Sequence, residues 1–248
     1  MDIKVIKTGL TEIADLRTLF LQENSFQFIY NKCHQFGWAD TYQFMADGHQ
    51  AGYGSVWGKD NRQSRDAIFE FYLLPEYRKQ APDIFPLFTA ESGALFVECQ
   101  TNDPFLTTML YGYCHNINAE AILFKEHFTT HFNIPGIIFR KQVAGDSIDG
   151  EDMYVLEKEG AIVATGGFVW NYNLPFIDMY YEVKEGYRRK GFGSLITQEL
   201  KKQAYNMARV PAARCNINNH ASKATLLKAG MQICGFILTG SLSKKIDR

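Results

Sequence analysis

One segment of the chain, residues 176–208, restricts the fold more than any other. Phe176 to Val183 is an apolar run that predicts a β-strand, and Gly193 to Ala208 carries apolar residues at the spacing of an amphipathic helix. The loop between them ends in Arg-Arg-Lys-Gly-Phe-Gly, residues 188–193. A strand, a short loop and a helix in this order predict an α/β fold, in which helices cover a mostly buried sheet.

The same loop has the composition of an anion-binding site. The start of a helix leaves backbone N–H groups without partners and carries a partial positive charge. Gly191 and Gly193 keep side chains away from that backbone and permit unusual backbone angles. Positive charge and a hydroxyl donor stand beside the glycines: Arg188, Arg189, Lys190 and Ser194. The loop lacks both the Gly-Lys-Ser/Thr ending of a P-loop and the three glycines of the dinucleotide fingerprint.

Other strands and helices follow from hydrophobic periodicity and turn residues. The first half is expected to contain a strand at 3–6, helices starting near 11 and 26, a hairpin at 42–56, a strand at 67–74, a helix from 82 and a strand at 94–99. The second half is expected to contain a hairpin at 152–170, the strand and helix above, a strand at 212–217, a helix at 221–229 and a strand at 232–239.

The two halves share this order, which indicates an internal duplication. Residues 73–83 align with 183–193, and residues 98–103 align with 214–219. We therefore expect two tandem units, 1–130 and 131–248, joined within Thr129–Gly150, and the second unit has too few residues for helices before its hairpin. In the first copy of the loop, Ala81 and Asp83 replace the glycines and Pro82 removes a backbone donor, so this copy should not hold a phosphate.

The segment resembles the acyl-coenzyme A signature of the GNAT superfamily of N-acetyltransferases. The match is Arg188-x-x-Gly191-x-Gly193, with Val183 and Tyr187 before it. Downstream, Asn219-x-x-Ser222 and Lys228-Ala229-Gly230-Met231 resemble a second motif of that family. The clear resemblance covers about residues 152–240.

The resemblance implies a GNAT-like mixed, twisted sheet whose two central strands splay apart around acetyl-CoA, which serves as co-substrate. It implies that the backbone of Tyr181, Glu182 and Val183 pairs with the pantetheine arm. The pyrophosphate would bind the loop formed by Arg188, Arg189, Lys190, Gly191, Phe192, Gly193 and Ser194. Asn219 and Ser222 would lie near the thioester end. In that family the amine usually attacks the thioester directly, in a ternary complex.

Two carboxylates are candidates for the catalytic base. Asp178 and Glu182 share one face of the predicted strand with Tyr180, because side chains alternate along a strand. A bulge, which the family often has here, would break that alternation. The alternative for either residue is a solvated or salt-bridged carboxylate at the sheet rim.

The general acid is less well defined. The family's frequent acid, a tyrosine on the helix after Asn219, corresponds to Leu226 in this chain. His220 and Tyr205 are possible substitutes, and a thiol with a pKa near ~8.5 leaves tolerably without full protonation.

Composition narrows the possible partners. The net charge is -1, which favours neither nucleic acid nor an anionic membrane, and no run of residues is apolar enough for a membrane helix. Five cysteines without a Cys-x-x-Cys pair indicate free thiols in a reducing cytoplasm rather than disulfides, and no metal site is expected. The expected state is a monomer or a homodimer.

These observations predict a cytoplasmic acetyl-CoA-dependent N-acetyltransferase that acts on a small-molecule amine. Two alternatives remain at this point: a non-catalytic acyl-CoA sensor, and an acetyltransferase that modifies a protein lysine or N-terminus.

Overall fold

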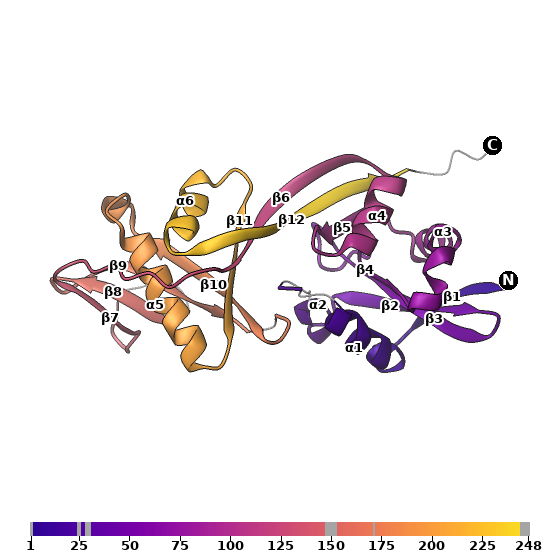
Figure 1. Cartoon of the computed structure of the whole chain (residues 1–248), viewed down its shortest axis with the longest axis horizontal. Coiled ribbons are helices and arrows are strands. Elements are labelled where there is room, and N and C mark those ends of the chain that lie inside the picture. Colours follow the sequence, from indigo (N-terminus) through magenta and orange to yellow (C-terminus); the bar gives the residue numbers. More distant parts are fainter. Residues whose placement is uncertain (1, 24–25, 28–30, 147–152, 171, 244–248) are drawn as a thin grey trace. The chain divides into compact units, whose positions relative to one another are not determined.

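The computed structural model describes residues 2–23, 26–27, 31–146, 153–170 and 172–243 of the chain. It divides into two compact units, which we call unit 1 (residues 1–120 and 236–248) and unit 2 (residues 121–235). Each unit combines a sheet with helices, and each is described here by itself (Figure 1).

Unit 1 is built on a mixed sheet in the order β1-β2-β3-β4-β5-β12. Strands β1 to β4 pair antiparallel, β5 runs parallel to β4, and β12 is antiparallel to β5. In chain order, its strands are β1 (Ile3–Thr8), β2 (Ala39–Ala46), β3 (His49–Trp57), β4 (Ala67–Leu73), β5 (Phe96–Gln100) and β12 (Met231–Leu242). Its helices are α1 (Ala14–Glu23), α2 (Asn31–Gln35), α3 (Ala81–Ser92) and α4 (Pro104–Tyr113).

Unit 2 repeats this plan in the order β7-β8-β9-β10-β11-β6. Its strands are β7 (Ile137–Lys141), β8 (Tyr154–Lys158), β9 (Ala161–Val169), β10 (Phe176–Val183), β11 (Val210–Asn216) and part of β6 (Cys114–Glu126). Its helices are α5 (Phe192–Asn206) and α6 (His220–Lys228). Strand β11 runs parallel to β10, as β5 does to β4, and the other neighbouring pairs are antiparallel.

The hairpins of the two units have the same turn chemistry. Asp47-Gly48 and Glu159-Gly160 both adopt positive φ, with 48° and 81° in the first turn and 51° and 78° in the second. Two consecutive residues at positive φ form the tight turn that matches the twist of the flanking strands. The sequence predicted both hairpins, and both are confirmed.

Two strands cross the boundary between the units. The first part of β6, residues 114–120, belongs to unit 1 and the remainder to unit 2, whereas β12 begins in unit 2 and ends in unit 1. Residues 237–241 of β12 pair with β5. The compact units therefore differ from the predicted division into 1–130 and 131–248, because the end of the chain completes the sheet that its beginning starts. The predicted linker, 129–150, contains β7, and its part from residue 147 lies outside the described residues.

Most predicted elements are present, and the exceptions have physical reasons. Of the helix expected at 26–36, the described residues contain only α2, and residues 28–30 lie outside the described part of the chain. Residue 152, the first residue of the predicted second hairpin, also lies outside it. Helix α4 and strands β6 and β7 were not predicted. As predicted, the described residues between β6 and the hairpin of unit 2 form no helix.

In both units the central parallel strands separate soon after they begin to pair. Strands β10 and β11 pair only at Phe176–Asp178 with 210–212, and β4 and β5 pair only at Ala67 and Ile68 with Phe96 and Val97. All four strands continue past those pairs. The splayed central pair that the family resemblance implied is therefore confirmed in unit 2, and unit 1 has one as well.

Candidate functional site

The loop between β10 and α5 changes direction sharply. A short 3-10 helix, Glu185–Tyr187, follows the strand, and then Arg188 is extended with ψ 157°. Arg189 and Gly191 take positive φ, 62° and 88°. Residues in the left-handed region turn the chain so that successive amide groups point to one side, which forms an anion-binding concavity.

The amide groups of this loop have no partners among the described residues. The first amide of the helix that is bonded is Leu195, which donates to the carbonyl of Gly191 at 3.1 Å. No hydrogen bond connects the preceding amides, from Arg189 to Ser194, to any described residue. Apart from buried Phe192 and Ser194, these residues are exposed or partly exposed. Unpaired amides at a helix N-terminus bind anions, because the helix dipole adds to their individual polarity.

Three basic side chains surround the amides. Arg188 Nε donates to the carbonyl of Val183 at 3.1 Å, which fixes the base of the loop to the strand. Lys190 Nζ donates to the carbonyl of Gly186 at 3.0 Å and lies 5.4 Å from the ring centre of Tyr187. Arg189 is exposed and extends from the turn itself. The loop thus combines backbone donors with positive charge.

The two glycines of the loop are required for different reasons. Gly191 has φ 88°, a conformation that side chains disfavour, and its surroundings leave room for a Cβ, with Ile134 at 3.5 Å. Gly193 has ordinary angles, but a Cβ there would lie 2.9 Å from Cγ2 of Thr225 on α6. Gly191 therefore permits the turn, whereas Gly193 permits close packing of α5 on α6. From the sequence we expected both to give a phosphate access to the backbone.

Ser194 also differs from its expected use. Its side chain is buried, and its hydroxyl donates to the carbonyl of Thr225 at 3.5 Å. Its amide, rather than its hydroxyl, is the group that remains available. Phe192 is buried as well and contacts Tyr187 edge-on, with ring centroids 6.2 Å apart.

The gap between β10 and β11 opens beside this loop. Beyond Asp178, the edge of β10 that faces β11 pairs with no described strand, while its other edge pairs with β9 as far as Val183. The backbone of Tyr181, Glu182 and Val183 thus offers an open strand edge, as the resemblance to the family implied. An extended ligand can add to such an edge through main-chain hydrogen bonds.

A cluster of small polar groups lines the gap on the side of the helices. The hydroxyl of Tyr181 lies 3.3 Å from Oγ of Ser222, at the start of α6. Asn219 caps α6, because its Oδ1 accepts a hydrogen bond from the Ser222 amide at 3.0 Å. Burial raises the pKa of Tyr181, and hydrogen bonds with Ser222 and Thr225 oppose this only in part. Neither Thr225 nor the hydroxyl of Tyr181 was singled out from the sequence.

The two candidate bases occupy different environments. The register of β10 with β9 is continuous from Asp178 to Val183, so no bulge interrupts the alternation, and Asp178 and Glu182 share a strand face as predicted. Asp178 is buried, and its carboxylate lies 3.6 Å from Nε of Arg214. Glu182 is 77% exposed and lies 4.0 Å from Arg188.

The candidate acids are not equivalent either. Leu226 is buried and apolar, so the helix position that carries the family's frequent acid donates no proton here. Tyr205 lies near the far end of α5, and its hydroxyl donates to Glu126 at 2.9 Å. Burial and this carboxylate raise the pKa of Tyr205 to about 12. His220 is exposed at the first position of α6.

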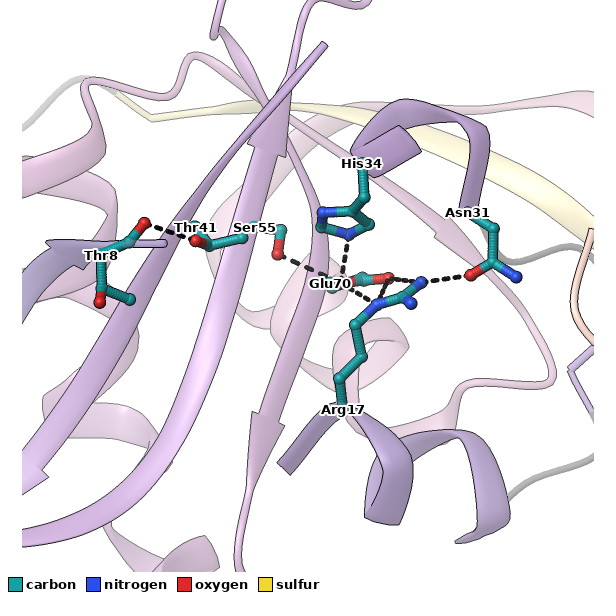
Figure 2. A network of polar contacts seen from close by, with 7 residues as sticks. All are labelled: Thr8, Arg17, Asn31, His34, Thr41, Ser55 and Glu70. Atoms are coloured by element: carbon teal, nitrogen blue, oxygen red, sulfur yellow. Dashed lines mark hydrogen bonds and ion pairs between the residues drawn. The ribbon is translucent and has the colours of Figure 1, made fainter. Parts of the chain in front are cut away.

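The corresponding strand of unit 1 carries a buried carboxylate instead of an open face. Figure 2 shows Arg17 from α1, His34 from α2 and Ser55 from β3 directed at Glu70 on β4. Arg17 donates to Glu70 at 3.0 Å, His34 Nε2 lies 3.0 Å away, and Ser55 donates at 3.1 Å. Burial acts to raise the pKa of Glu70, but the charges of Arg17 and His34 hold it well below its usual range. This network fastens two helices to the sheet.

Comparison with known proteins agrees with this geometry. Residues 119–231 match the sequence model described as the acetyltransferase (GNAT) family. This range nearly coincides with unit 2. No curated protein is significantly similar to the chain. Within the described residues, no group of side chains suits a metal ion and no helix is long and apolar enough to cross a membrane.

Several solved structures share the fold over the full chain. A GNAT-family acetyltransferase from Colwellia psychrerythraea has a TM-score of 0.79 at 14% identity, covering 98% of this chain and 100% of its own. A GCN5-related N-acetyltransferase from Sphaerobacter thermophilus has 0.65 at 13% identity, covering 99% and 98%. A tandem GNAT protein from the clavulanic acid biosynthesis pathway has 0.66 at 9% identity, covering 98% and 100%.

Residues 119–231 thus match the GNAT acetyltransferase family, and both the loop and the open strand edge lie within this range. The predicted GNAT-like mixed sheet flanked by helices is confirmed, and the tandem neighbour agrees with two such units in one chain.

Proposed function

We propose that the protein is an acetyl-CoA-dependent N-acetyltransferase that acts on a small-molecule amine, and that only unit 2 binds the coenzyme. The amides from Arg189 to Ser194, which have no partner in the described part of the chain and are flanked by exposed basic side chains, carry this proposal. A pyrophosphate suits this site, since it presents several anionic oxygens to several donors at once.

The remaining parts of the coenzyme have matching features. The pantetheine arm contains amide groups, which suit the free edge of β10 at Tyr181, Glu182 and Val183. Asn219 and Ser222 lie at the start of α6, across the gap from that edge. Acetyl-CoA supplies an acyl group on a thiol leaving group, so an amine can attack it directly without an acyl-enzyme.

The amine must lose its proton before it attacks, and Asp178 and Glu182 are the proposed bases. Their environments separate the outcomes of mutation. Asp178→Asn removes the carboxylate beside Arg214, so it should lower stability as well as turnover. Glu182→Gln changes an exposed group and should lower turnover alone if this residue is the base. With kcat measured well below the unfolding transition of each variant, so that lost stability does not lower it, the variant with the larger fall in kcat identifies the base.

A non-catalytic acyl-CoA sensor is the second candidate, and buried Leu226 is the observation that favours it. A sensor would bind acetyl-CoA without releasing its thiol. The third candidate, a protein acetyltransferase, would prefer peptide lysines or N-termini over small amines. The net charge of -1 supports neither nucleic acid nor membrane as partner, and we propose a cytoplasmic monomer or homodimer.

A thiol-release assay with acetyl-CoA separates these candidates. The amine panel contains aminoglycosides, polyamines and amino acids, with lysine peptides as a separate arm. We expect release with at least one small amine, together with a higher melting temperature in acetyl-CoA, because ligand binding stabilises the native state. Stabilisation without release on any amine would support the sensor, and absence of both would overturn the proposal.

A further inference from the structure

We propose that the hydroxyl of Tyr181 protonates the departing thiolate of coenzyme A, with Ser222 holding that hydroxyl in place. The inference rests on the proposed function and assigns the general acid that Leu226 does not provide. It is carried by the position of Tyr181 in the gap between β10 and β11 and by a comparison of that gap in the two units.

The position follows from the strand pairing. Asp178 and Ala212 form the last pair of β10 with β11, and Tyr181 and Cys215 lie equally far beyond it on the two separating strands. Tyr181 points to the face covered by the helices, because a Cβ on Gly193 would lie 3.5 Å from its ring atom Cε2. Its hydroxyl reaches Ser222 at 3.3 Å. The phenol therefore reaches from β10 to the start of α6, on the side of the gap that the helices cover.

In unit 1, the gap between β4 and β5 has apolar side chains at the positions of Tyr181 and Ser222. Asp103 caps α4 through the Leu106 amide, as Asn219 caps α6 through the Ser222 amide, so Leu106 corresponds to Ser222. By the alignment of the strands, Phe71 corresponds to Tyr181. Phe71 is fully buried and stacks on Phe105 of α4, with ring centroids 5.4 Å apart.

Around this gap, the two units differ in polar atoms at three matching positions. Where unit 1 places Phe71 and Leu106, unit 2 places Tyr181 and Ser222, and Met109 of α4 corresponds to Thr225 of α6. These three residues are half-buried, and a hydroxyl withdrawn from water costs free energy unless it finds a partner, so they are not neutral replacements of apolar side chains. They appear in the unit whose loop can hold a phosphate.

In the proposed step, one bond to the acyl carbon forms and another breaks. The amine nitrogen forms a bond to the acyl carbon, and the carbon–sulfur bond breaks with its electron pair on sulfur. The Tyr181 hydroxyl gives its proton to that sulfur, and the amine's proton goes to the base. The phenolate regains a proton from solvent through the hydroxyl of Ser222, which is partly exposed. Burial raises the pKa of Tyr181, so it is protonated before the step.

Tyr205 provides a matched control. It also lies in unit 2, and the pKa of its hydroxyl is also raised, but it follows Gly193 along α5 by about 18 Å at ~1.5 Å per residue. Tyr205→Phe therefore removes a similar hydroxyl far from the gap. Ser222→Ala keeps the phenol and removes one of the two hydroxyls that hydrogen-bond to it.

The first test measures turnover of acetyl-CoA with an accepted amine as a function of pH. We expect Tyr181→Phe to lower kcat at least tenfold and to remove a basic limb from the kcat profile, with KM for acetyl-CoA little changed. Ser222→Ala should lower kcat less, and Tyr205→Phe should match the wild type. If Tyr181→Phe keeps the wild-type kcat and profile, the inference is overturned while the proposed function stands. If the wild type itself releases no thiol, the proposed function fails.

The second test needs no turnover. A donor beside sulfur favours the thiolate, so free coenzyme A should bind the wild type more tightly as pH rises through ~8.5, the ordinary pKa of a thiol. Tyr181→Phe should lose this increase, and desulfo-coenzyme A should show none with either protein. An equal pH dependence in wild type and Tyr181→Phe, measured by calorimetry, would contradict a contact between Tyr181 and the sulfur.

Discussion

The two strand–loop–helix segments of this chain share a frame and differ in a few backbone angles. In each, an amide near the end of the strand starts a 3-10 helix: Tyr77 donates to Leu74, and Tyr187 donates to Lys184, both at 2.9 Å. In each, an arginine returns to the strand, since Arg78 Nε lies 3.3 Å from the carbonyl of Leu73 and Arg188 Nε lies 3.1 Å from that of Val183.

After that arginine the two segments diverge. In unit 1 the 3-10 helix extends from Pro75 to Gln80 and runs directly into α3, where Pro82 has no amide hydrogen. In unit 2 the 3-10 helix ends at Tyr187, and positive φ angles at Arg189 and Gly191 turn the chain before α5. In unit 1 the segment after the arginine is helical throughout. In unit 2 the amide groups of that segment have no partner among the described residues. A shared fold therefore does not imply a shared site.

The strands that precede the two loops also differ, because β4 is covered on both faces and β10 is partly open. Every residue of β4 is buried, whereas β10 exposes Tyr180 and Glu182. Helices α1 and α2 contribute Arg17 and His34 to Glu70 in unit 1, and the described residues of unit 2 contain no counterpart of these helices (Figure 2). We infer that unit 1 has a structural role.

The largest expected effect comes from breaking the buried network of unit 1. Glu70→Gln leaves the guanidinium of Arg17 buried without its carboxylate, and removal of one member of a buried ion pair costs about 3–5 kcal/mol. Denaturant unfolding should show this loss, while coenzyme A binding at temperatures below the transition should stay close to wild type. A loss of binding in the folded variant would contradict a purely structural role for unit 1.

Acid should weaken the same network. The pKa of Glu70 in the folded protein is held below its usual range by Arg17 and His34. The stabilisation is therefore complete above the unfolded-state pKa, near ~4.3, and is lost as the pH falls towards the folded value. Unfolding measured from pH 6 downwards should lose stability below about pH 4.3. Glu70→Gln should show a shallower slope, and an identical slope in the variant would assign the acid sensitivity to other carboxylates.

A smaller loss of stability is expected at Gly193, where it tests whether the glycine serves helix packing or phosphate access. Alanine would normally stabilise a helix position relative to glycine, but a Cβ here lies 2.9 Å from Cγ2 of Thr225. Gly193→Ala should therefore cost about 1–3 kcal/mol by overpacking. Thr225→Ser removes that methyl group and should recover most of the loss in the double variant. Additive losses in unfolding experiments on the single and double variants would show that the contact is not the cause.

Gly191→Ala should cost about 1–2 kcal/mol, because an L-residue at φ 88° is strained even though space is available. Gly93 of unit 1 ends α3 at φ 68° with open space around it, and Gly93→Ala is the matched control. Both variants should lose comparable stability, and only Gly191→Ala should also weaken coenzyme A binding. Equal binding in both would mean that the turn at Gly191 does not shape the anion site.

The site could be predicted from the sequence largely because its parts are local. Strand, loop, glycines and the Asn219 cap lie within a short stretch and follow from periodicity and capping chemistry. Even so, the separate reasons for Gly191 and Gly193 depend on α6, which meets the loop only in the folded chain. The same holds for the contact between Tyr181 and Ser222.

The elements that were not predicted depend on distant partners, or carry sequence signals other than hydrophobic periodicity. Helix α4 begins after an Asp103 cap and Pro104, which is a recognisable start signal. Strand β6 has no clean alternation, because its neighbours change from unit 1 to unit 2 along its length. The pairing of β12 with β5 joins residues too far apart for any local pattern. Glu70, alone in the apolar run Ala67–Leu73, did carry a signal, since a lone buried carboxylate requires a partner.

The central claim is that unit 2 holds a phosphate in its loop and unit 1 does not. Arg189 and Lys79 occupy corresponding positions in the two loops, and both are exposed. Calorimetric titration of coenzyme A into Arg189→Glu, Lys79→Glu and wild type compares the loops directly without altering glycine or packing. We predict that Arg189→Glu weakens binding about tenfold or more, since a charged hydrogen bond contributes about 1.5–3 kcal/mol, and that Lys79→Glu binds as wild type. Equal affinity for all three proteins, or equal weakening by both substitutions, would contradict the account.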